Sequence, residues 1–359
     1  MKGIFRLARI FGIDIDIHVT FLLLLFFFFI MMGVKGVVLI VGVFFFVTVH
    51  ELCHGLAAAY FGIKIKRITL LPIGGVASMP EEPKKPLHEL VIAAAGPLSN
   101  VLVLLIFYYP LYLLLGRETL LYPFLAITGQ VKYAGNFNVI AHIYWINLVL
   151  VVFNMLPAFP MDGGRVLRAV LSYRMGYKKA TAAAVRFGHI FAILFAYLGI
   201  VYGHIFLILI AVFIYMAASS EGLQVDVDET IKRYSVQDIL SGDFVSVDTG
   251  TTLSKILELI FHTHQEDFPV IENGSLAGFI TRSEVLRGIH EGGKEINAGS
   301  VMRRDIPAVR ATDGLHVVRK LMQKHNTRAL PVEKNGTIAG VVTLEDINRL
   351  YVMVNENVA

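Results

Sequence analysis

The stretch VTVHELCH, residues 47–54, lies inside a long apolar run, and it decides how the rest of the chain is interpreted. On a helix, the pattern His-Glu-x-x-His places two imidazoles one turn apart on the same face. His50 and His54 can then bind a zinc ion together, while Glu51 between them can act as a general base. Ionisable side chains are costly in a membrane-spanning helix and usually mark function. The stretch therefore predicts a catalytic zinc site within the membrane.

The composition favours a membrane protein that also has a soluble part. Of the 359 residues, 55% are hydrophobic and only 17% are charged, and the mean hydropathy is +0.65. Apolar residues dominate up to about Ser220, whereas the sequence after Glu221 is an ordinary globular mixture. A formal net charge of +4 is too small to indicate a nucleic-acid partner, and a single cysteine excludes an intrachain disulfide.

Six apolar segments are predicted to cross the membrane, since a helix needs roughly 20 apolar residues to span the hydrocarbon core. They are His18–Met32, Val37–Phe61, Leu90–Leu115, Val139–Leu156, Ala183–Tyr202 and His204–Ala218. Lys and Arg are concentrated in the N-terminal tail and in the segments Gly62–Leu87 and Pro157–Lys179. By the positive-inside rule, both termini and the C-terminal part are expected in the cytosol, on a multi-pass protein of the cell membrane.

Two connections between the spans have patterns that a plain loop does not require. The segment Ile63–Met79 alternates and is predicted to form a membrane-associated β-hairpin that turns at Pro72–Gly75. The segment Asn154–Gly164 contains two prolines and a Gly-Gly pair, which must break the fourth span. Irregular backbone at membrane depth is tolerated only where it lines a cavity. This break is therefore expected to place backbone groups and one carboxylate, that of Asp162, inside the membrane.

The C-terminal part contains an internal repeat, because residues Asp267–Thr281 recur as Ala329–Thr343. Each copy is predicted to form a helix, a strand, an Asn-Gly turn, a strand and a helix. One copy buries too little to be stable alone, so the two predict one compact α/β module. The expected domains are a membrane domain at 1–220, a linker at 221–235 that is acidic and short of apolar residues, and two repeats at 236–292 and 298–354.

A catalytic zinc needs a third protein ligand and one open position. Asp162 is the best candidate, because its surroundings, broken by proline and glycine, serve no plain packing purpose. It could instead cap the helix that begins near Gly163. His142, His189 and His204 are competing ligands, although each lies near the end of a predicted span, where histidines without a metal are common. Cys53 points about 100° away from His54 around the helix and is interpreted as a small packing residue.

Four motifs together resemble the site-2 protease family of intramembrane metalloproteases, peptidase family M50. They are His50-Glu51-x-x-His54, Leu71-Pro72-Ile73-Gly74-Gly75, Ala95-Gly96-Pro97-Leu98-Ser99-Asn100 and Asn154-x-x-Pro157-x-x-Pro160-x-Asp162-Gly163. The resemblance implies a zinc-dependent endopeptidase that cleaves transmembrane segments of membrane proteins in the lipid bilayer, with one Zn²⁺ per chain. It also implies roles for five residues: the zinc ligands His50, His54 and Asp162, the base Glu51, and Asn154 as a group that helps to hold the substrate backbone. Cys53 departs from the family, which usually has glycine there.

The C-terminal repeats resemble tandem CBS domains through Gly278-x-x-Thr281 and Gly340-x-x-Thr343. In CBS domains the stretch Gly-h-h-Thr-x-x-Asp, where h is hydrophobic, contacts the ribose and phosphates of an adenine nucleotide. The resemblance therefore implies a regulatory adenine nucleotide. Thr343 and Asp346 of the second copy match this stretch, whereas the first copy has Thr281 and Glu284, with Glu in place of Asp. The alternative is a module that is purely structural or that forms a homodimer.

Two other classes of protein compete with this interpretation. A CBS-regulated membrane transporter or channel without protease activity would explain charges inside the membrane, but not the His-Glu-x-x-His helix combined with Pro-x-Asp-Gly. The spans also lack the internal symmetry of many transporters. An inactive membrane scaffold conflicts with the complete ligand set. The expected fold is therefore a polytopic α-helical membrane protein with about six transmembrane helices and a β-hairpin, plus a cytosolic α/β tandem CBS module.

Overall fold

The computed structural model describes residues 3–356, apart from 73, 79–82, 84, 128–137, 241–242, 264 and 335. The chain forms two compact units, Met1–Leu223 and Gln224–Ala359. The first unit contains most of the apolar sequence, and the second contains both repeats.

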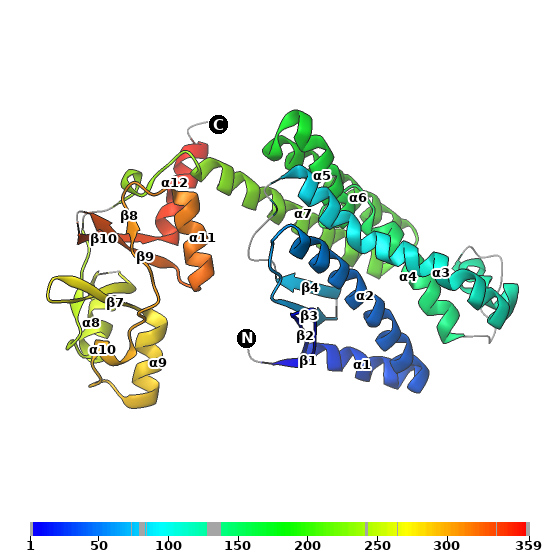
Figure 1. Ribbon diagram of the computed structural model, residues 1–359, viewed down its shortest axis with the longest axis horizontal. Coiled ribbons are helices and arrows are strands. Elements are labelled where there is room, and N and C mark those ends of the chain that lie inside the picture. Colours follow the sequence, from blue (N-terminus) through cyan, green and yellow to red (C-terminus); the bar gives the residue numbers. More distant parts are fainter. Residues whose placement is uncertain are drawn as a thin grey trace. The chain divides into compact units, whose positions relative to one another are not determined.

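The first unit is built mainly from helices (Figure 1). They are α1 (Val19–Met32), α2 (Val34–Tyr60), α3 (Pro86–Ile127, with a break at Gly116), α4 (Val139–Asn154), α5 (Asp162–Met175), α6 (Tyr177–Val201) and α7 (Ile205–Ile231). Among the described residues, α2, α3, α6 and α7 are long and apolar enough to cross a membrane, while α1 and α4 are shorter apolar helices. All six predicted segments coincide with these helices. The number of helices that cross, and their direction, stay predictions.

The helices of the first unit keep large apolar side chains exposed. Phe26 of α1, Leu105 of α3, Ile193 of α6 and Phe206 of α7 are all more than half exposed. Soluble monomers rarely expose continuous apolar surface of this extent, whereas lipid-facing helices require it. The helical lengths and the exposed apolar surface together identify a membrane protein.

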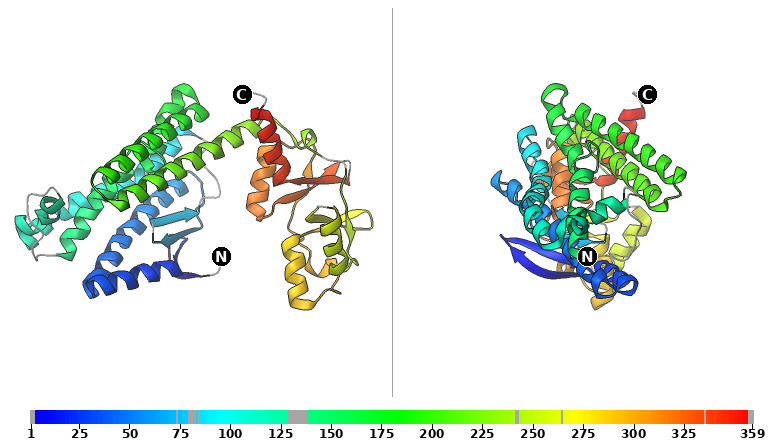
Figure 2. Two further views of the ribbon diagram at one scale, coloured as in Figure 1. Left: turned by 180° about the vertical axis from the view of Figure 1, so that it is seen from behind. Right: turned by 90° about the vertical axis from the view of Figure 1, so that its right-hand side faces the viewer.

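A four-stranded sheet lies beside α1 and α2 (Figures 1 and 2). Its order is β1 (Ile4–Ile10), β2 (Ile13–His18), β3 (Arg67–Leu71) and β4 (Gly74–Ser78). β2 runs parallel to β3, and the other neighbouring pairs are antiparallel. Sequence reasoning missed β1 and β2, although the alternation IDIDI at 13–17 is typical of a strand with one buried face.

β4 is an edge strand of this sheet. The segment Ile63–Met79, predicted as a hairpin, contains β3 and β4, with Leu71 opposite Gly74 in the antiparallel register. Ile73 and Met79 lie outside the described residues. Both strands pack against α2, so the edge of the sheet lies next to the helix that carries the His-Glu-x-x-His pattern.

The second unit consists of two similar halves. The first contains β5 (Val247–Asp248), α8 (Leu253–Thr263), β6 (Asp267–Glu272), β7 (Ser275–Thr281) and α9 (Arg282–Gly292). The second contains β8 (Val309–Arg310), α11 (Leu315–His325), β9 (Ala329–Lys334), β10 (Thr337–Thr343) and α12 (Leu344–Glu356), and the short helices η1 (Val236–Asp238) and α10 (Ala298–Val301) precede the respective halves. Each half has a three-stranded sheet with one parallel and one antiparallel pair.

The order of elements in each half is that of the predicted repeat. Asn273 and Gly274 both have positive φ in the turn between β6 and β7, which is the conformation that an Asn-Gly hairpin turn needs. The corresponding Asn335 lies outside the described residues.

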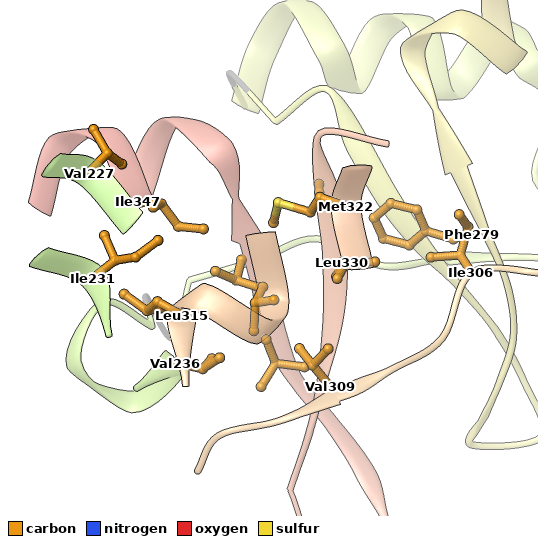
Figure 3. Close-up of a cluster of buried hydrophobic side chains, with 14 residues drawn as sticks. Val227, Ile231, Val236, Phe279, Ile306, Val309, Leu315, Met322, Leu330 and Ile347 are labelled. Carbon is orange, nitrogen blue, oxygen red and sulfur yellow. The ribbon is translucent and has the colours of Figure 1, made fainter. Parts of the chain in front are cut away.

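The segment 221–235 differs from the predicted linker, because α7 continues through it to Ile231. Val227 and Ile231 are only 8% and 0% exposed, and they belong to the same buried cluster as Leu315 and Ile347 (Figure 3). These two apolar residues are one helical turn apart and face the core together. The end of α7 is therefore part of the second unit rather than a connection outside it.

We predict that Ile231→Ala lowers the free energy of unfolding of the second unit by roughly 2–5 kcal/mol, because it leaves a cavity in the buried cluster. Leu286→Ala on α9, where the side chain is 49% exposed, is the control and should change it by less than about 0.5 kcal/mol. Urea unfolding of the soluble fragment 224–359, followed by circular dichroism, measures both. A fragment that starts at Val236 and is equally stable would contradict the role of α7.

Candidate metal centre

Two histidines of α2 and one carboxylate of α5 converge inside the first unit. Nε2 of His50 lies 3.0 Å from Nε2 of His54. Oδ2 of Asp162 lies 3.1 Å from the first nitrogen and 3.2 Å from the second. Both histidines are buried and Asp162 is nearly so. Across the described part of the chain, these residues form the one group of His, Cys, Asp or Glu that could hold a metal ion.

The three side chains fit a zinc ion. With metal–ligand bonds of about 2.0–2.1 Å and tetrahedral geometry, ligand atoms lie roughly 3.3–3.4 Å apart. The separations of 3.0–3.2 Å are therefore close to those of a three-ligand site. Nδ1 of His54 lies 2.6 Å from the carbonyl oxygen of Ile92, so Nδ1 carries the proton and donates it. This tautomer leaves the lone pair of Nε2 directed at the metal position.

Close packing at the start of α5 positions Asp162. Asp162 is the first residue of the helix and the preceding residue is the N-cap, so its side chain does not cap α5. A Cβ on Gly163 would lie 2.3 Å from the carbonyl oxygen of Leu156, and one on Gly164 would lie 2.5 Å from the carbonyl carbon of Ala158. The Gly-Gly pair is therefore what allows α5 to begin against the preceding turn.

Gly96 of α3 faces the two histidines. A Cβ at this position would lie 2.2 Å from Nε2 of His54 and 2.6 Å from Nε2 of His50. Both distances are far below van der Waals contact, so any side chain would fill the space beside the metal-binding nitrogens. Sequence reasoning quoted Gly96 within a family motif without assigning it this role.

Glu51 lies between the histidines and the edge strand of the sheet. It is partly buried, and its carboxylate is close enough to His50, His54 and Asp162 to interact with all three charges or dipoles. A Cβ on Gly75 of β4 would lie 2.7 Å from Cγ of Glu51, so the backbone of β4 passes directly against this side chain. The candidate base therefore lies next to both the metal position and the edge of the sheet.

A buried ion network holds α5 against α3 and α7. Nε of Arg168 donates a hydrogen bond of 2.7 Å to Glu89, and Nη1 donates one of 2.7 Å to Glu221. The side chains of Arg168 and Glu89 are each 5% exposed. The guanidinium carbon also lies 4.8 Å from the ring centre of Phe159 and 4.7 Å from that of Tyr177. The charge is thus paired with two carboxylates and lies over two aromatic rings.

This network supports both sides of the metal centre. Glu89 lies one turn before Ile92, whose carbonyl orients His54. Arg168 lies six residues after Asp162 on the same helix. An ion pair between Glu89 and Arg168 therefore fixes the two helices at the points where they present a ligand and a supporting carbonyl. The network joins residues far apart in the sequence, and sequence reasoning missed it.

The other predicted candidates lie away from this cluster. His142 is hydrogen-bonded to a backbone carbonyl one turn earlier on α4, His189 to a serine of α7, and His204 is exposed. Cys53 is partly buried and lies outside the metal-binding group. Asn154 is the last residue of α4, partly buried, at the start of the turn that leads to α5.

The predicted nucleotide contacts occupy equivalent places at two helix N-termini. Thr343 contributes its amide and hydroxyl to Asp346, at 3.0 and 2.6 Å, where α12 begins. Thr281 contacts Glu284 in the same way where α9 begins. Close to this first pair, burial, reinforced by neighbouring carboxylates, raises the pKa of Asp267 to about 6.

Comparison with known proteins identifies both units. Residues 38–195 match the family model described as peptidase family M50, and residues 236–291 and 298–352 match the CBS domain. A zinc metalloprotease of Methanocaldococcus jannaschii is 32% identical over 96% of this chain and 95% of its own length. A putative zinc metalloprotease of Synechocystis is 26% identical over 82% and 78%, respectively. Both predicted resemblances are thereby confirmed.

A solved structure, the site-2 protease from Methanocaldococcus jannaschii, also aligns with this chain. The sequence identity is 37%, and the alignment covers 61% of this chain and 95% of that one, with a TM-score of 0.44.

We predict that Gly96→Ala abolishes zinc binding, because the new methyl group would occupy the space beside His50 and His54. The substitution should not weaken α3 itself, since alanine favours a helix over glycine by about 1 kcal/mol. Gly222→Ala on α7 is the control, because its Cβ would meet only side-chain atoms of Val185 at 3.2 Å or more. Zinc per chain, measured by plasma mass spectrometry, is the readout, and a Gly96→Ala protein with one zinc would contradict the account.

Proposed function

The chain belongs to peptidase family M50 and is a zinc metalloprotease, and we propose that it cleaves peptide bonds within the transmembrane segments of other membrane proteins. The observation that carries this proposal is that His50, His54 and Asp162 meet on α2 and α5, beside helices with exposed apolar surfaces. α2 is itself long and apolar enough to cross a membrane. A catalytic centre on such a helix acts on substrates that reach the same depth.

His50, His54 and Asp162 are the residues that would hold the zinc. When bound, zinc supplies a Lewis acid that makes water acidic near neutral pH and polarises a carbonyl group. Glu51 takes the proton from the attacking water and later passes it to the leaving nitrogen. His54 does not compete as the base, because its Nδ1 carries the proton donated to Ile92 and the lone pair of its Nε2 would be bound to the metal.

The edge of β4 supports the binding of an extended substrate. Backbone amides of a membrane helix are paired internally, so a transmembrane substrate must unwind before attack. β4 is an edge strand whose Gly75 lies against Glu51. A substrate strand added to this edge would run past the base. Asn154, at the end of α4, is proposed to hold the substrate backbone from another side of the site.

The distribution of Lys and Arg supports a multi-pass topology in which both termini and the second unit face the cytosol. In that topology the CBS pair is exposed to cytosolic nucleotides. We propose that it binds an adenine nucleotide at Thr343 and Asp346, which match the CBS stretch in the second copy and lie where α12 begins. Thr281 and Glu284 are proposed as the weaker site, because Glu284 stands where the CBS stretch has Asp.

Glu51→Gln should retain one zinc per chain and abolish the cleavage of a single-span substrate, because the amide keeps the shape of the carboxylate but cannot accept a proton. Asp162→Ala is the contrasting variant and should lose the zinc as well as the activity. Zinc content and cleavage by the purified protein in lipid vesicles check both. If the Glu51→Gln protein cleaved the substrate at more than about a hundredth of the wild-type rate, Glu51 would not be the base.

An adenine nucleotide should bind the full-length protein and change its cleavage rate, provided that it binds one arrangement of the second unit more tightly than another. Titration calorimetry with ATP, ADP and AMP measures the binding. Asp346→Asn should weaken it by roughly tenfold or more, whereas Asp238→Asn, in a similar cap at Ser235, should not. No heat and unchanged proteolysis with all three nucleotides would leave the module as a dimerisation platform.

A further inference from the structure

A cavity of 190 Å³ lies beside the metal centre, between β4, α3 and α5. Its walls include Ala77 of β4, Glu89 and Ala93 of α3, and Arg165 and Arg168 of α5. Glu89 and Ala93 are buried, so the cavity is formed by the packed interior of the first unit rather than by a surface loop alone. None of the roles described above uses this space.

Two arginines of α5 line the cavity, and their partners among the described residues differ. Arg168 is neutralised by Glu89 at 2.6 Å and by Glu221 at 2.7 Å. Arg165 is partly buried and forms no hydrogen bond or ion pair with any residue that the structure describes. The charge of Arg165 acts on the carboxylate of Glu51, although the two side chains form no ion pair. Arg165 is therefore free to bind an anion that enters the cavity.

The cavity lies along the edge where the substrate strand is proposed to pair. Ala77 in its wall lies two residues after Gly75, which contacts Glu51. Residues two apart in a strand point to the same face and are separated by about 7 Å. In a substrate strand paired with β4, the side chains would alternate between the two faces of the sheet in the same way. The side chain two residues from the scissile bond would then face the cavity.

We propose that this cavity binds an acidic side chain of the substrate, Asp or Glu, two residues from the scissile bond, and that Arg165 pairs with its carboxylate. This inference rests on the proposed function, because it assumes that the substrate strand follows β4. A guanidinium binds a carboxylate through two parallel hydrogen bonds.

The test uses a single-span substrate whose cleavage bond has been mapped, with Glu or Gln placed in turn at each position up to three residues from that bond. For the wild-type protein, kcat/KM should be roughly tenfold or more higher for Glu than for Gln at one position two residues away. Arg165→Gln should reduce this ratio to about 1, and Arg165→Glu should favour Lys over Glu at the same position. Arg174→Gln, an exposed residue on the same helix, should keep the wild-type ratio.

A binding measurement separates this inference from the proposed function. The dissociation constants of the Glu and Gln substrates are measured with zinc-loaded Glu51→Gln protein, alone and combined with Arg165→Gln. A preference for Glu that is lost with Arg165→Gln supports the carboxylate site even if no substrate is cleaved, in which case only the proposed function fails. Equal affinities for Glu and Gln, or an unchanged preference in the Arg165→Gln protein, would overturn the carboxylate site.

Discussion

The first unit depends on one contact, the meeting of the Asp162 carboxylate with the imidazoles of His50 and His54, which are up to 112 residues away in the chain. Burying three such groups in an apolar unit is unfavourable unless they bind one another or a metal ion. The surrounding structure makes the contact sterically and electrostatically feasible. The glycines after Asp162 allow α5 to approach, Gly96 leaves the space beside the imidazoles open, and the buried pair of Arg168 and Glu89 fixes the helices.

The same elements link the metal centre to the surfaces that a substrate and a regulator would use. β4 crosses Glu51 at Gly75, so the sheet edge and the base are parts of one site. On the other side, Glu221 of α7 completes the ion network three residues before the second unit begins. α7 then continues as one helix to Ile231, whose side chain is buried in the second unit. Within the first unit, Glu221 connects α7 to Arg168 of α5.

Local patterns in the sequence were sufficient to predict the parts of the site that depend on local geometry. Helical spacing alone pairs His50 with His54, and the proline and glycine residues around Asp162 indicate a broken helix. The family and the CBS pair follow from motifs and from an internal repeat in the amino-acid sequence. These broken surroundings made Asp162 the best candidate for the third ligand, but a helix cap remained an equal alternative until the resemblance favoured the ligand.

The features that sequence reasoning missed depend on partners distant in the chain. β1 and β2 form because β2 finds β3 about fifty residues later, and only then does the IDIDI alternation acquire a buried face. The end of α7 was interpreted as a linker because this segment has few apolar residues. Two of them, Val227 and Ile231, nevertheless pack into the core formed by the second repeat.

The central claim is tested most directly by the X-ray absorption spectrum of the zinc in the purified protein. Our account predicts only nitrogen and oxygen ligands at about 2.0–2.1 Å, with the scattering of two imidazoles, whereas a sulfur ligand at about 2.3 Å, or a single imidazole, would contradict it.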